Sequence, residues 1–373
     1  MKRIWLSPPH MSGNEMKYIQ EAFDNNWIAP LGKNVDAFEL AIKNYLNIPC
    51  ITAVNSGTAA LHLALIALGI GKGDEVIVPT FTFVGSVNPV LYQSAIPVFV
   101  DSEPDTWNMD PELLEQVILD RHNKGKQPKA IIMVHVYGMP AKIQEILKIA
   151  QKYDLPVIED AAEALGSRYN NGFLGTFGDI GILSFNGNKI ITTSGGGALI
   201  SSHERYTKLA LFLATQAREK APHYQHTQIG YNYRISNIVA GIGRGQMEVI
   251  EERISQRRNN FQFYHQQLSR YDFIAFLQED KFSFSNYWLT TILIHHPIIT
   301  RETIRKELEA HNIESRPLWK PMHLQPVFKS FPAYLNGISE HLFNKGLCLP
   351  SGSNLTQEDK HRIIQVLHQI LQG

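Results

Sequence analysis

Short apolar runs alternate with amphipathic segments over the first two-thirds of the chain. Several of these runs are rich in valine and isoleucine and show little alternation of apolar and polar residues. That pattern is typical of strands covered on both faces. The predicted strands are Glu75–Pro79, Pro97–Asp101, Ala130–Val136, Pro156–Asp160, Gly181–Phe185 and Ala198–Ser201.

Segments with helical periodicity lie between these strands: Thr58–Leu68, Val84–Gln93, Pro111–Leu119 and Lys142–Tyr153. Alternation of strands and helices predicts an α/β domain with a largely parallel sheet. In such sheets ligands bind at the carboxyl ends of the strands, where Asp160 and Ser184 fall. This edge is therefore the first place to look for a site.

The sequence pattern changes near residue 245, and a helix is predicted over Gln246–Ser269. We expect the tandem Arg257-Arg258 to lie on a solvated face of that helix. A strand at Leu289–Ile294 and helices at Thr303–Asn312 and Thr356–Leu371 are predicted to follow. We therefore predict two domains, a large one over residues 1–245 and a smaller C-terminal one over residues 246–373.

Composition narrows the class of protein. The chain has 373 residues, of which 44% are hydrophobic, and its 35 basic side chains balance 35 acidic ones, so nothing indicates nucleic-acid binding. Two cysteines and scattered histidines suggest neither a disulfide framework nor a metal site. The first residues lack the apolar stretch of a signal peptide, and no apolar run reaches membrane-spanning length. We expect a soluble cytoplasmic protein without a membrane partner.

Lys189 and Asp160 carry the most specific chemistry. Lys189 follows small polar residues, and Asp160 ends an apolar strand 29 positions earlier. A pyridoxal-phosphate (PLP) enzyme needs such a pair, because the lysine amine forms a Schiff base with the cofactor and the carboxylate keeps the pyridine nitrogen protonated. Each residue alone has a plainer interpretation, Lys189 as an exposed loop lysine and Asp160 as a helix cap. The glycine run Gly195–Gly197, which lets the backbone approach a ligand, favours the catalytic interpretation.

Ser56, Gly57 and Thr58 open a predicted helix directly after an apolar run. Backbone N–H groups at a helix N-terminus bind phosphate, although a Ser-Gly-Thr sequence is more often only a helix cap. The Ser184 hydroxyl could reach the same phosphate, and Phe83, which follows a strand end, could stack on a cofactor ring or pack in the core.

Taken together, these residues resemble the PLP-dependent sugar aminotransferases of the DegT/DnrJ/StrS type. The resemblance covers nearly the whole chain and is carried by Asn26–Gly32, Val54–Leu61, Pro79–Phe83, Val157–Ala162, Ser184–Lys189, Gly230–Asn237 and Arg316–His323. It implies the fold type I aminotransferase architecture, with a mostly parallel seven-stranded sheet covered by helices and a smaller α+β C-terminal domain. It also implies that the N-terminal 30 residues or so line the active site.

The resemblance assigns roles at matching positions. Lys189 would be the catalytic Schiff-base lysine, and the implied cofactor contacts are Gly57, Thr58, Phe83, Asp160, Ala162, Glu163, Ser184 and Asn237. Asn237 would reach the phosphate of a neighbouring subunit, so a homodimer with shared active sites is expected. The implied substrate contacts are Trp27, Ile28, Ala29, Ser56, His226, Arg234, Arg316, Trp319 and His323. The loop from His223 to Arg234 would cross to the partner's site.

One position departs from the commonest family pattern. Many members have histidine where this chain has Glu163, whereas a subset resembling the UDP-4-amino-sugar (bacillosamine-type) aminotransferases has glutamate. The family's dehydratase offshoot replaces the lysine with histidine, and the presence of Lys189 disfavours that interpretation.

The function expected from this resemblance is transfer of an amino group from L-glutamate to a nucleotide-linked keto-sugar for amino-sugar or surface-glycan biosynthesis. The favoured acceptor position is C4 of a UDP-linked 4-keto-6-deoxy hexose, which could carry an acetamido group, while GDP- or dTDP-linked sugars and 3-keto sugars stay open. Two alternatives also stay open: a PLP-dependent elimination or dehydration on a sugar, and a non-catalytic PLP-binding regulator.

Overall fold

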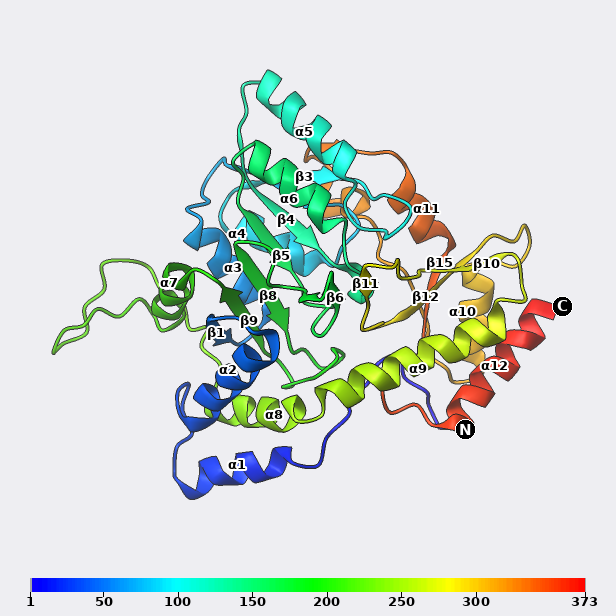
Figure 1. Cartoon of the computed structure of the whole chain (residues 1–373), viewed down its shortest axis with the longest axis horizontal. Helices are drawn as coiled ribbons and strands as arrows, with labels where there is room; N and C mark the ends of the chain where they lie inside the picture. Colours follow the sequence, from blue (N-terminus) through cyan, green and yellow to red (C-terminus); the bar gives the residue numbers. More distant parts are fainter. Residues whose placement is uncertain (1, 373) are drawn as a thin grey trace.

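A twisted eight-stranded sheet forms the centre of the computed structural model, which describes residues 2–372 (Figure 1). Its strand order is β1-β9-β8-β5-β4-β2-β3-β14, and every neighbouring pair is parallel except those that β9 makes with β8 and β1. The strands are β1 (Cys50–Val54), β2 (Glu75–Pro79), β3 (Ile96–Val100), β4 (Pro128–Val134), β5 (Val157–Asp160), β8 (Ile180–Ser184), β9 (Gly197–Ser201) and β14 (Ala333–Tyr334).

All six strands predicted for the first two-thirds of the chain are present, and no end differs by more than two residues. The mostly parallel sheet is confirmed, but it has eight strands and not the expected seven. The extra strand, β14, comes from the C-terminal part and pairs with Phe99 and Val100 of β3. Its two residues follow Pro332 and precede Asn336-Gly337, so they carry no periodic signal.

Helices cover both faces of the sheet. Figure 1 shows α5 and α6 in front of the strands and α3 and α4 behind them. Their buried faces supply the main hydrophobic core, which is continuous with the strands. The helices are α1 (Glu15–Asp24), α2 (Lys33–Leu46), α3 (Gly57–Ala67), α4 (Asn88–Tyr92), α5 (Pro111–Asn123), α6 (Ile143–Lys152), α7 (Glu204–Ala214) and α8 (Asn237–Met247).

Two segments that were predicted as continuous helices are each interrupted. The segment Gln246–Ser269 is not one helix: α8 ends at Met247, and α9 spans Ile250–Leu268, with Val249 at φ −118° and ψ 12° between them. The segment Val84–Gln93 is a 3-10 turn, Val84–Ser86, followed by α4. Pro89 stands in the first turn of α4, where its missing N–H costs nothing, so the proline starts a new helix there.

The C-terminal part contains a second sheet, with order β10-β12-β15-β13, and all of its pairs are antiparallel. Its elements are β10 (Ile274–Phe276), β12 (Thr290–Ile294), α10 (Arg301–Ala310), β13 (Arg316–Pro317), α11 (Ile338–Lys345), β15 (Gly346–Leu349) and α12 (Gln357–Gln372). A separate hydrophobic core lies among β12, β15, α9, α10 and α12, and Ile4 from the N-terminal segment joins it. A division at residue 245 stays a prediction.

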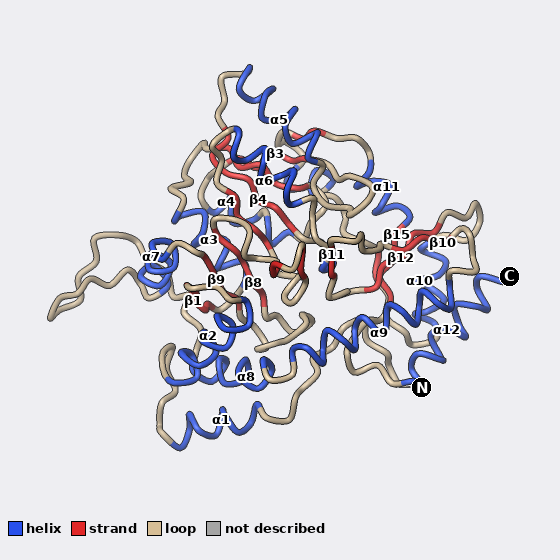
Figure 2. Tube along the Cα trace, viewed as in Figure 1, coloured by secondary structure: helices blue, strands red, loops and turns tan. Residues whose placement is uncertain are grey.

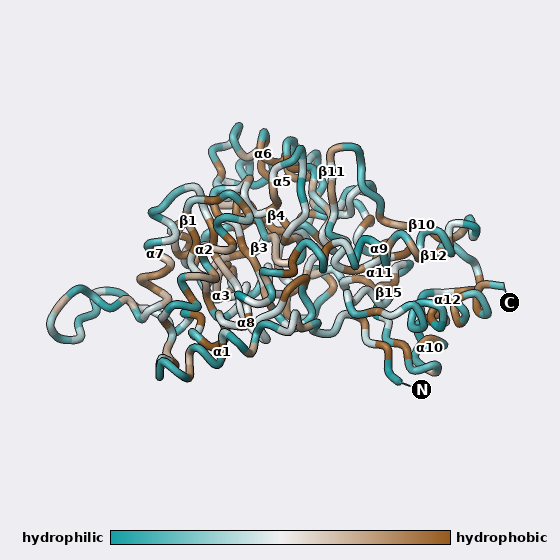
Figure 3. Tube along the Cα trace, turned by 60° about the horizontal axis from the view of Figure 1, so that its bottom comes forward, coloured by the Kyte–Doolittle hydropathy of each residue, from teal (hydrophilic) through white to brown (hydrophobic). Residues whose placement is uncertain are grey.

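A long connection without regular structure links α7 to α8. It projects away from the rest of the molecule in Figure 1, and Figure 2 shows it as loop over most of its length. Figure 3 shows this loop as largely hydrophilic, whereas hydrophobic residues concentrate along the strands of the central sheet. The apolar side chains of Tyr224 and Ile229 are exceptions, being 77% and 84% exposed.

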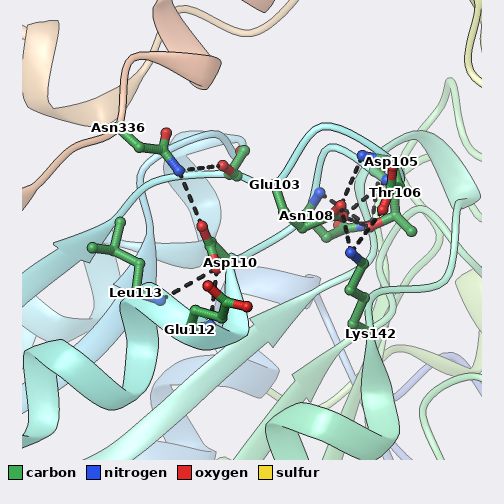
Figure 4. Close-up of polar contacts among 10 residues, drawn as sticks. Glu103, Asp105, Thr106, Asn108, Asp110, Glu112, Leu113, Lys142 and Asn336 are labelled. Carbon is green, nitrogen blue, oxygen red and sulfur yellow. Dashed lines mark hydrogen bonds and ion pairs between the residues drawn. The ribbon is translucent and has the colours of Figure 1, made fainter.

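The loop after β3 is fixed by polar contacts that Figure 4 shows. The Glu103 carboxylate accepts hydrogen bonds from the N–H groups of Asp105 and Thr106 at 2.7 and 2.9 Å, and Lys142 lies 3.2 Å from it. Asn108 accepts from the Val136 N–H at 2.9 Å and donates to the Met139 carbonyl at 3.0 Å. These contacts hold the turn after β4, which contributes to the site described below.

No helix within residues 2–372 combines the length and the apolar character needed to cross a membrane. The same residues contain no group of three or more histidine, cysteine, aspartate or glutamate side chains arranged to hold a metal ion.

Candidate active site

A cavity opens at the carboxyl edge of the central sheet, where β5 and β8 end and α3 begins. This is the edge that the strand pattern predicted. The predicted residues that line it are Ser56, Gly57, Thr58, Phe83, Asp160, Ala162, Glu163, Ser184, Lys189 and Trp319. Two of the predicted substrate residues, Ser56 and Trp319, and all of the predicted cofactor residues except Asn237 therefore lie around one cavity.

Asp160 is the last residue of β5 and is buried, with 5% of its surface exposed. Its Oδ2 accepts a hydrogen bond from the Ser86 hydroxyl at 2.7 Å, and its Oδ1 accepts one from the Ala162 N–H at 3.1 Å. Ser86 is in turn 2.9 Å from the Thr82 hydroxyl. Because buried carboxylates need such partners, the two donors fix the orientation of Asp160 and stabilise it.

Lys189 projects into the same cavity from a tight turn that its own N–H closes onto the Asn186 carbonyl at 3.0 Å. Its Nζ lies 3.7 Å from Glu163 Oε1 and 4.1 Å from the centroid of the Trp288 ring. Burial lowers the pKa of Lys189, while the carboxylates of Glu163 and Asp160 act in the opposite direction. The amine is therefore closer to its neutral, nucleophilic form than an exposed lysine would be.

Glu163 is the carboxylate nearest to Lys189. Its Oε2 accepts a hydrogen bond from the Tyr137 N–H at 2.7 Å. Burial raises the pKa of Glu163, and the charge of Lys189 opposes that rise. The pKa of Lys189 is thus lowered and the pKa of Glu163 is raised, so the two values approach each other. Such pairs are typical of functional sites.

Tyr137 connects Glu163 to the C-terminal part of the chain. Its ring lies between those of Trp288 and Trp319, with interplanar angles of 16° and 9°, and its hydroxyl accepts the Trp319 N–H at 2.8 Å. Tyr137 has φ 56° and Gly138 has φ 89°, so the chain makes a left-handed turn here. An added Cβ at Gly138 would lie 2.0 Å from Asn286 Oδ1, which explains the glycine.

The N-terminus of α3 faces the end of β8. Ser56 caps the helix by accepting the Ala59 N–H at 3.0 Å, and a Cβ added at Gly57 would lie 3.1 Å from the Ser184 Cβ. The first N–H groups of the helix and the hydroxyls of Thr58 and Ser184 consequently border the cavity. A helix N-terminus with nearby hydroxyls suits a phosphate group. With Asp160 and Lys189 across the same cavity, the residues present fit PLP.

Four predicted substrate residues lie outside this cavity in the single chain. The Arg234 guanidinium pairs with Glu39 at 2.5 Å and donates to the Ala53 carbonyl at 2.9 Å, which is a structural role beside β1. His323 is held 2.7 Å from the Thr80 hydroxyl. Arg316 is an exposed residue paired with Glu314, and His226 lies in the projecting loop.

Trp27, Ile28 and Ala29 are also absent from the lining of the cavity. Trp27 lines a second hollow together with Asn237. Asn237 donates from its side chain to the Trp27 carbonyl at 3.0 Å and accepts the Asn34 N–H at 3.0 Å. It is 3% exposed. Within its own chain Asn237 therefore holds the segment before α2, and its contact with a neighbouring phosphate stays a prediction.

Several residues that shape the site were not identified from the sequence. Ser86 and Tyr137 follow strand ends and could have been found there. Trp288 lies in the C-terminal part, and only the fold brings it to Lys189. The prediction of a solvated face is wrong for Arg257, which is 1% exposed. Arg258 is partly buried and donates to the Ser285 carbonyl at 2.5 Å.

Comparisons with known proteins agree with this geometry. Residues 9–368 match the model of the DegT/DnrJ/EryC1/StrS aminotransferase family. The chain is 50% identical to EpsN of Bacillus subtilis (strain 168), named provisionally as a pyridoxal phosphate-dependent aminotransferase, over 98% of this chain and 95% of that protein. It is 38% identical to the GDP-perosamine synthase of Escherichia coli O157:H7, over 99% of each chain.

Solved structures extend the likeness to three dimensions. A DegT DnrJ EryC1 StrS aminotransferase from Brucella abortus superposes with a TM-score of 0.91 at 29% identity, over 97% of this chain and 96% of that one. The PLP form of the sugar aminotransferase Spr1654 from Streptococcus pneumoniae, a function its name gives provisionally, has a TM-score of 0.91 at 25% identity, over 100% and 99% of the chains. The chain belongs to the DegT/DnrJ/EryC1/StrS family of PLP-dependent sugar aminotransferases.

Proposed function

We propose that the protein transfers the amino group of L-glutamate to C4 of a nucleotide-linked keto-sugar, with Lys189 as the residue that moves the proton. The observation that carries this proposal is the position of the Lys189 amine, 3.7 Å from Glu163 and on the same cavity as Asp160. An elimination or a regulatory role would not account better for these three groups.

The protein's own side chains have separate roles in proton transfer and in holding the cofactor. When bound, PLP supplies an electron sink for the electron pair left as the Cα–H bond of the amino donor breaks. Lys189 takes that proton and returns it, and its burial leaves the amine neutral enough to act as a general base. Asp160 would face the pyridine nitrogen and hold a proton on it, and the N-terminus of α3 with Thr58 and Ser184 would hold the phosphate.

Both half-reactions use one site in turn. The amino donor leaves as a keto acid before the keto-sugar enters, and Lys189 then moves a proton in the opposite sense, which is ping-pong chemistry. Phe83 and Trp319 stand at the cavity, with ring centroids 5.4 Å apart, and Phe83 is 49% exposed. We assign these two rings to contacts with the bound cofactor and the entering substrate.

The identity of the nucleotide is the most specific part of the proposal. Glu163 at the position after Ala162 favours a UDP-linked sugar through the sequence resemblance, whereas the relative that is 38% identical is named for a GDP-linked product. We propose a UDP-linked 4-keto-6-deoxy hexose as the acceptor and take the GDP-linked sugar as the specific competitor. The product would serve amino-sugar or surface-glycan biosynthesis in the cytoplasm.

We also propose that the active form is a homodimer. Trp27 and Leu31, which line the second hollow, are 48% and 55% exposed, and Ile28 between them in the sequence is 54% exposed. Exposed apolar side chains so close together mark an interface. The projecting loop between α7 and α8 exposes Tyr224 and Ile229 as well. Because α1, α2 and that loop bring no substrate residue into their own cavity, a second subunit would give them a role.

The test is a substrate panel with purified protein, PLP and L-glutamate. UDP-linked and GDP-linked 4-keto-6-deoxy sugars and a 3-keto sugar are supplied in turn, and amino-sugar formation is followed by mass spectrometry together with release of 2-oxoglutarate. We expect turnover with the UDP-linked 4-keto sugar. Turnover with the GDP-linked sugar alone would overturn the nucleotide assignment, and a dehydrated product without 2-oxoglutarate would overturn amino transfer.

A further inference from the structure

Arg257 is an unusual charged group near the Lys189 cavity, and it has no role in the proposed reaction. It lies on α9 and is 1% exposed, and its guanidinium contacts no carboxylate among the described residues. A buried cation without an anionic partner costs several kcal/mol (roughly) in desolvation, so such groups are retained where they do something. The tandem sequence Arg257-Arg258 gave no sign of this.

The guanidinium donates hydrogen bonds to four acceptors, which belong to four separate segments of the chain. Nη1 donates to the carbonyls of Trp288 at 2.5 Å and Ser351 at 3.4 Å. Nη2 donates to the Ser7 hydroxyl at 2.9 Å and to the Lys189 carbonyl at 3.3 Å. The Nε–H, although buried, has no hydrogen-bond partner within residues 2–372. All four acceptors are neutral, so the positive charge is solvated by dipoles but not neutralised.

Two of these segments, those of Ser7 and Trp288, also contact the turn that bears Lys189. The Asn188 carbonyl accepts from the Ser7 hydroxyl at 2.7 Å and from the Trp288 indole N–H at 2.7 Å. The same Trp288 ring lies 4.1 Å from the Lys189 amine. Arg257 therefore holds the lysine directly, through its carbonyl, and indirectly, through the two residues that hold Asn188.

We propose that Arg257 is a positioning residue for Lys189: it fixes the lysine-bearing turn against the C-terminal part of the chain, and its unneutralised charge favours the neutral lysine amine. This inference rests on the proposed role of Lys189. Arg257 does not touch the reacting atoms, and it acts through the turn and through its electric field.

The charges around both groups support the second half of the proposal. Glu163 and Asp160 face the Lys189 amine and favour its protonation, and Arg257 is the cation that opposes them. Around Arg257 the titratable groups are Lys189, Arg253 on the same helix, and His10 of the N-terminal segment. Burial and Arg253 lower the pKa of Arg257, but a guanidinium stays protonated in proteins, so the charge is permanent.

The test is a pH titration of the visible absorbance of PLP bound to the full-length protein, which reports protonation at the lysine–PLP linkage. Arg257→Met removes the charge and keeps the bulk of the side chain. We expect its titration midpoint to rise by about half a pH unit or more, because a nearby cation disfavours the protonated form. An unmoved or lowered midpoint in folded Arg257→Met would overturn the proposal.

Two further variants separate charge from geometry. Arg257→Lys keeps the charge and loses the fork that reaches four acceptors, so its midpoint should stay near that of the natural protein while PLP is released faster. Arg258→Met removes a charge one residue away and should shift nothing. If Arg257→Met does not fold, Arg257→Lys decides alone, because a midpoint shifted upward, or PLP retention equal to that of the natural protein, contradicts the proposal.

The same titration distinguishes this inference from the proposed function. A natural protein that shows no bound-PLP absorbance would contradict the role of Lys189 itself. A normal absorbance band whose midpoint ignores Arg257→Met would contradict only the role of Arg257.

Discussion

Opposed effects determine the protonation of the Lys189 amine. Burial disfavours its charge, whereas Glu163 at 3.7 Å and the nearby Asp160 favour it. The net result is a lowered pKa of Lys189, with burial as the largest cause. Catalysis needs this balance, because the same amine must bind the cofactor and later accept a proton.

Lys189→Ala should abolish amino transfer while the protein still takes up PLP, since Asp160 and the N-terminus of α3 are untouched. Loss of the proton-carrying group should lower turnover by about a thousandfold or more. Release of 2-oxoglutarate and PLP content after gel filtration measure the two effects. Lys208→Ala, which removes an exposed lysine from α7, is the matched control. Normal turnover in Lys189→Ala would exclude the mechanism.

Glu163→Gln should lower the pH midpoint of the bound-PLP absorbance. The Glu163 carboxylate is the largest charge that raises the pKa of Lys189, so its removal leaves the burial effect less opposed. A shift of about one pH unit is expected for a charge at this distance in a buried site. Glu112→Gln, at an exposed position on α5, controls for overall charge. A midpoint that rises, or stays fixed, would show that Glu163 does not act on the lysine.

At this scale the sequence identified residues by their type and their place at strand ends. Asp160 and Ser184 were singled out that way, Lys189 by the small polar residues before it and the glycines after it, and Glu163 by comparison with the family pattern. Trp288 and Arg257 could not be found, because each reaches the lysine from a segment that only the tertiary fold brings near. A tandem arginine on a helix gives the same pattern whether it is buried or solvated.

Among the elements, the turn after β4 depends on backbone conformations that few residues adopt. Tyr137 and Gly138 adopt left-handed conformations there, and Asn286 packs against the glycine while donating to the carbonyls of Glu163 and Leu165 at 3.0 Å each. The turn thus joins the carboxylate beside Lys189 to the segment before β12. Its geometry depends on a residue without a side chain.

Gly138→Ala should destabilise the protein by about 2–4 kcal/mol, through left-handed strain and the clash of its Cβ with Asn286 Oδ1. Gly13→Ala is the matched control, because Gly13 has φ 99° with nothing within 4 Å of an added Cβ and so reports strain alone. Chemical denaturation measures both. Equal losses in the two variants would mean that the contact with Asn286 contributes nothing.

Elements with a strong local pattern were predicted, and those defined by pairing were not. The six strands rich in valine and isoleucine are all present, whereas β14 exists only because β3 offers it an edge. The break between α8 and α9 was missed because the sequence from Gln246 to Ser269 keeps helical propensity through Val249. Met247 and Ile250, on either side of the break, both pack in the main core, so tertiary packing holds the two helices there.

For the molecule as a whole, the residues of the N-terminal segment and of the projecting loop explain why a dimer is proposed. Trp27 and Ile229 are exposed apolar side chains on segments that contribute nothing to the cavity of their own chain. The crossing loop that the sequence resemblance implied stays a prediction. Within the chain, Arg234 donates to Glu39 and Asn237 donates to the Trp27 carbonyl.

Replacing Tyr224 and Ile229 together by aspartate should weaken the dimer and lower specific activity at low protein concentration, because it places charges where apolar contacts are expected. Activity should recover as concentration rises. Sedimentation velocity and activity over a dilution series measure this, and Leu119→Asp, at an exposed position on α5, is the control. A monomer that is fully active at every concentration would rule out shared sites.

The measurement that tests the central claim most directly is the absorbance spectrum of the purified protein with PLP, before and after L-glutamate alone is added. The account predicts a visible band from PLP attached to Lys189, absent in Lys189→Ala, that is lost on addition of glutamate as pyridoxamine phosphate and 2-oxoglutarate form. A band that ignores glutamate would contradict the assigned amino donor. Folded protein that shows no such band with PLP present would contradict the role of Lys189, and with it the amino-transfer mechanism.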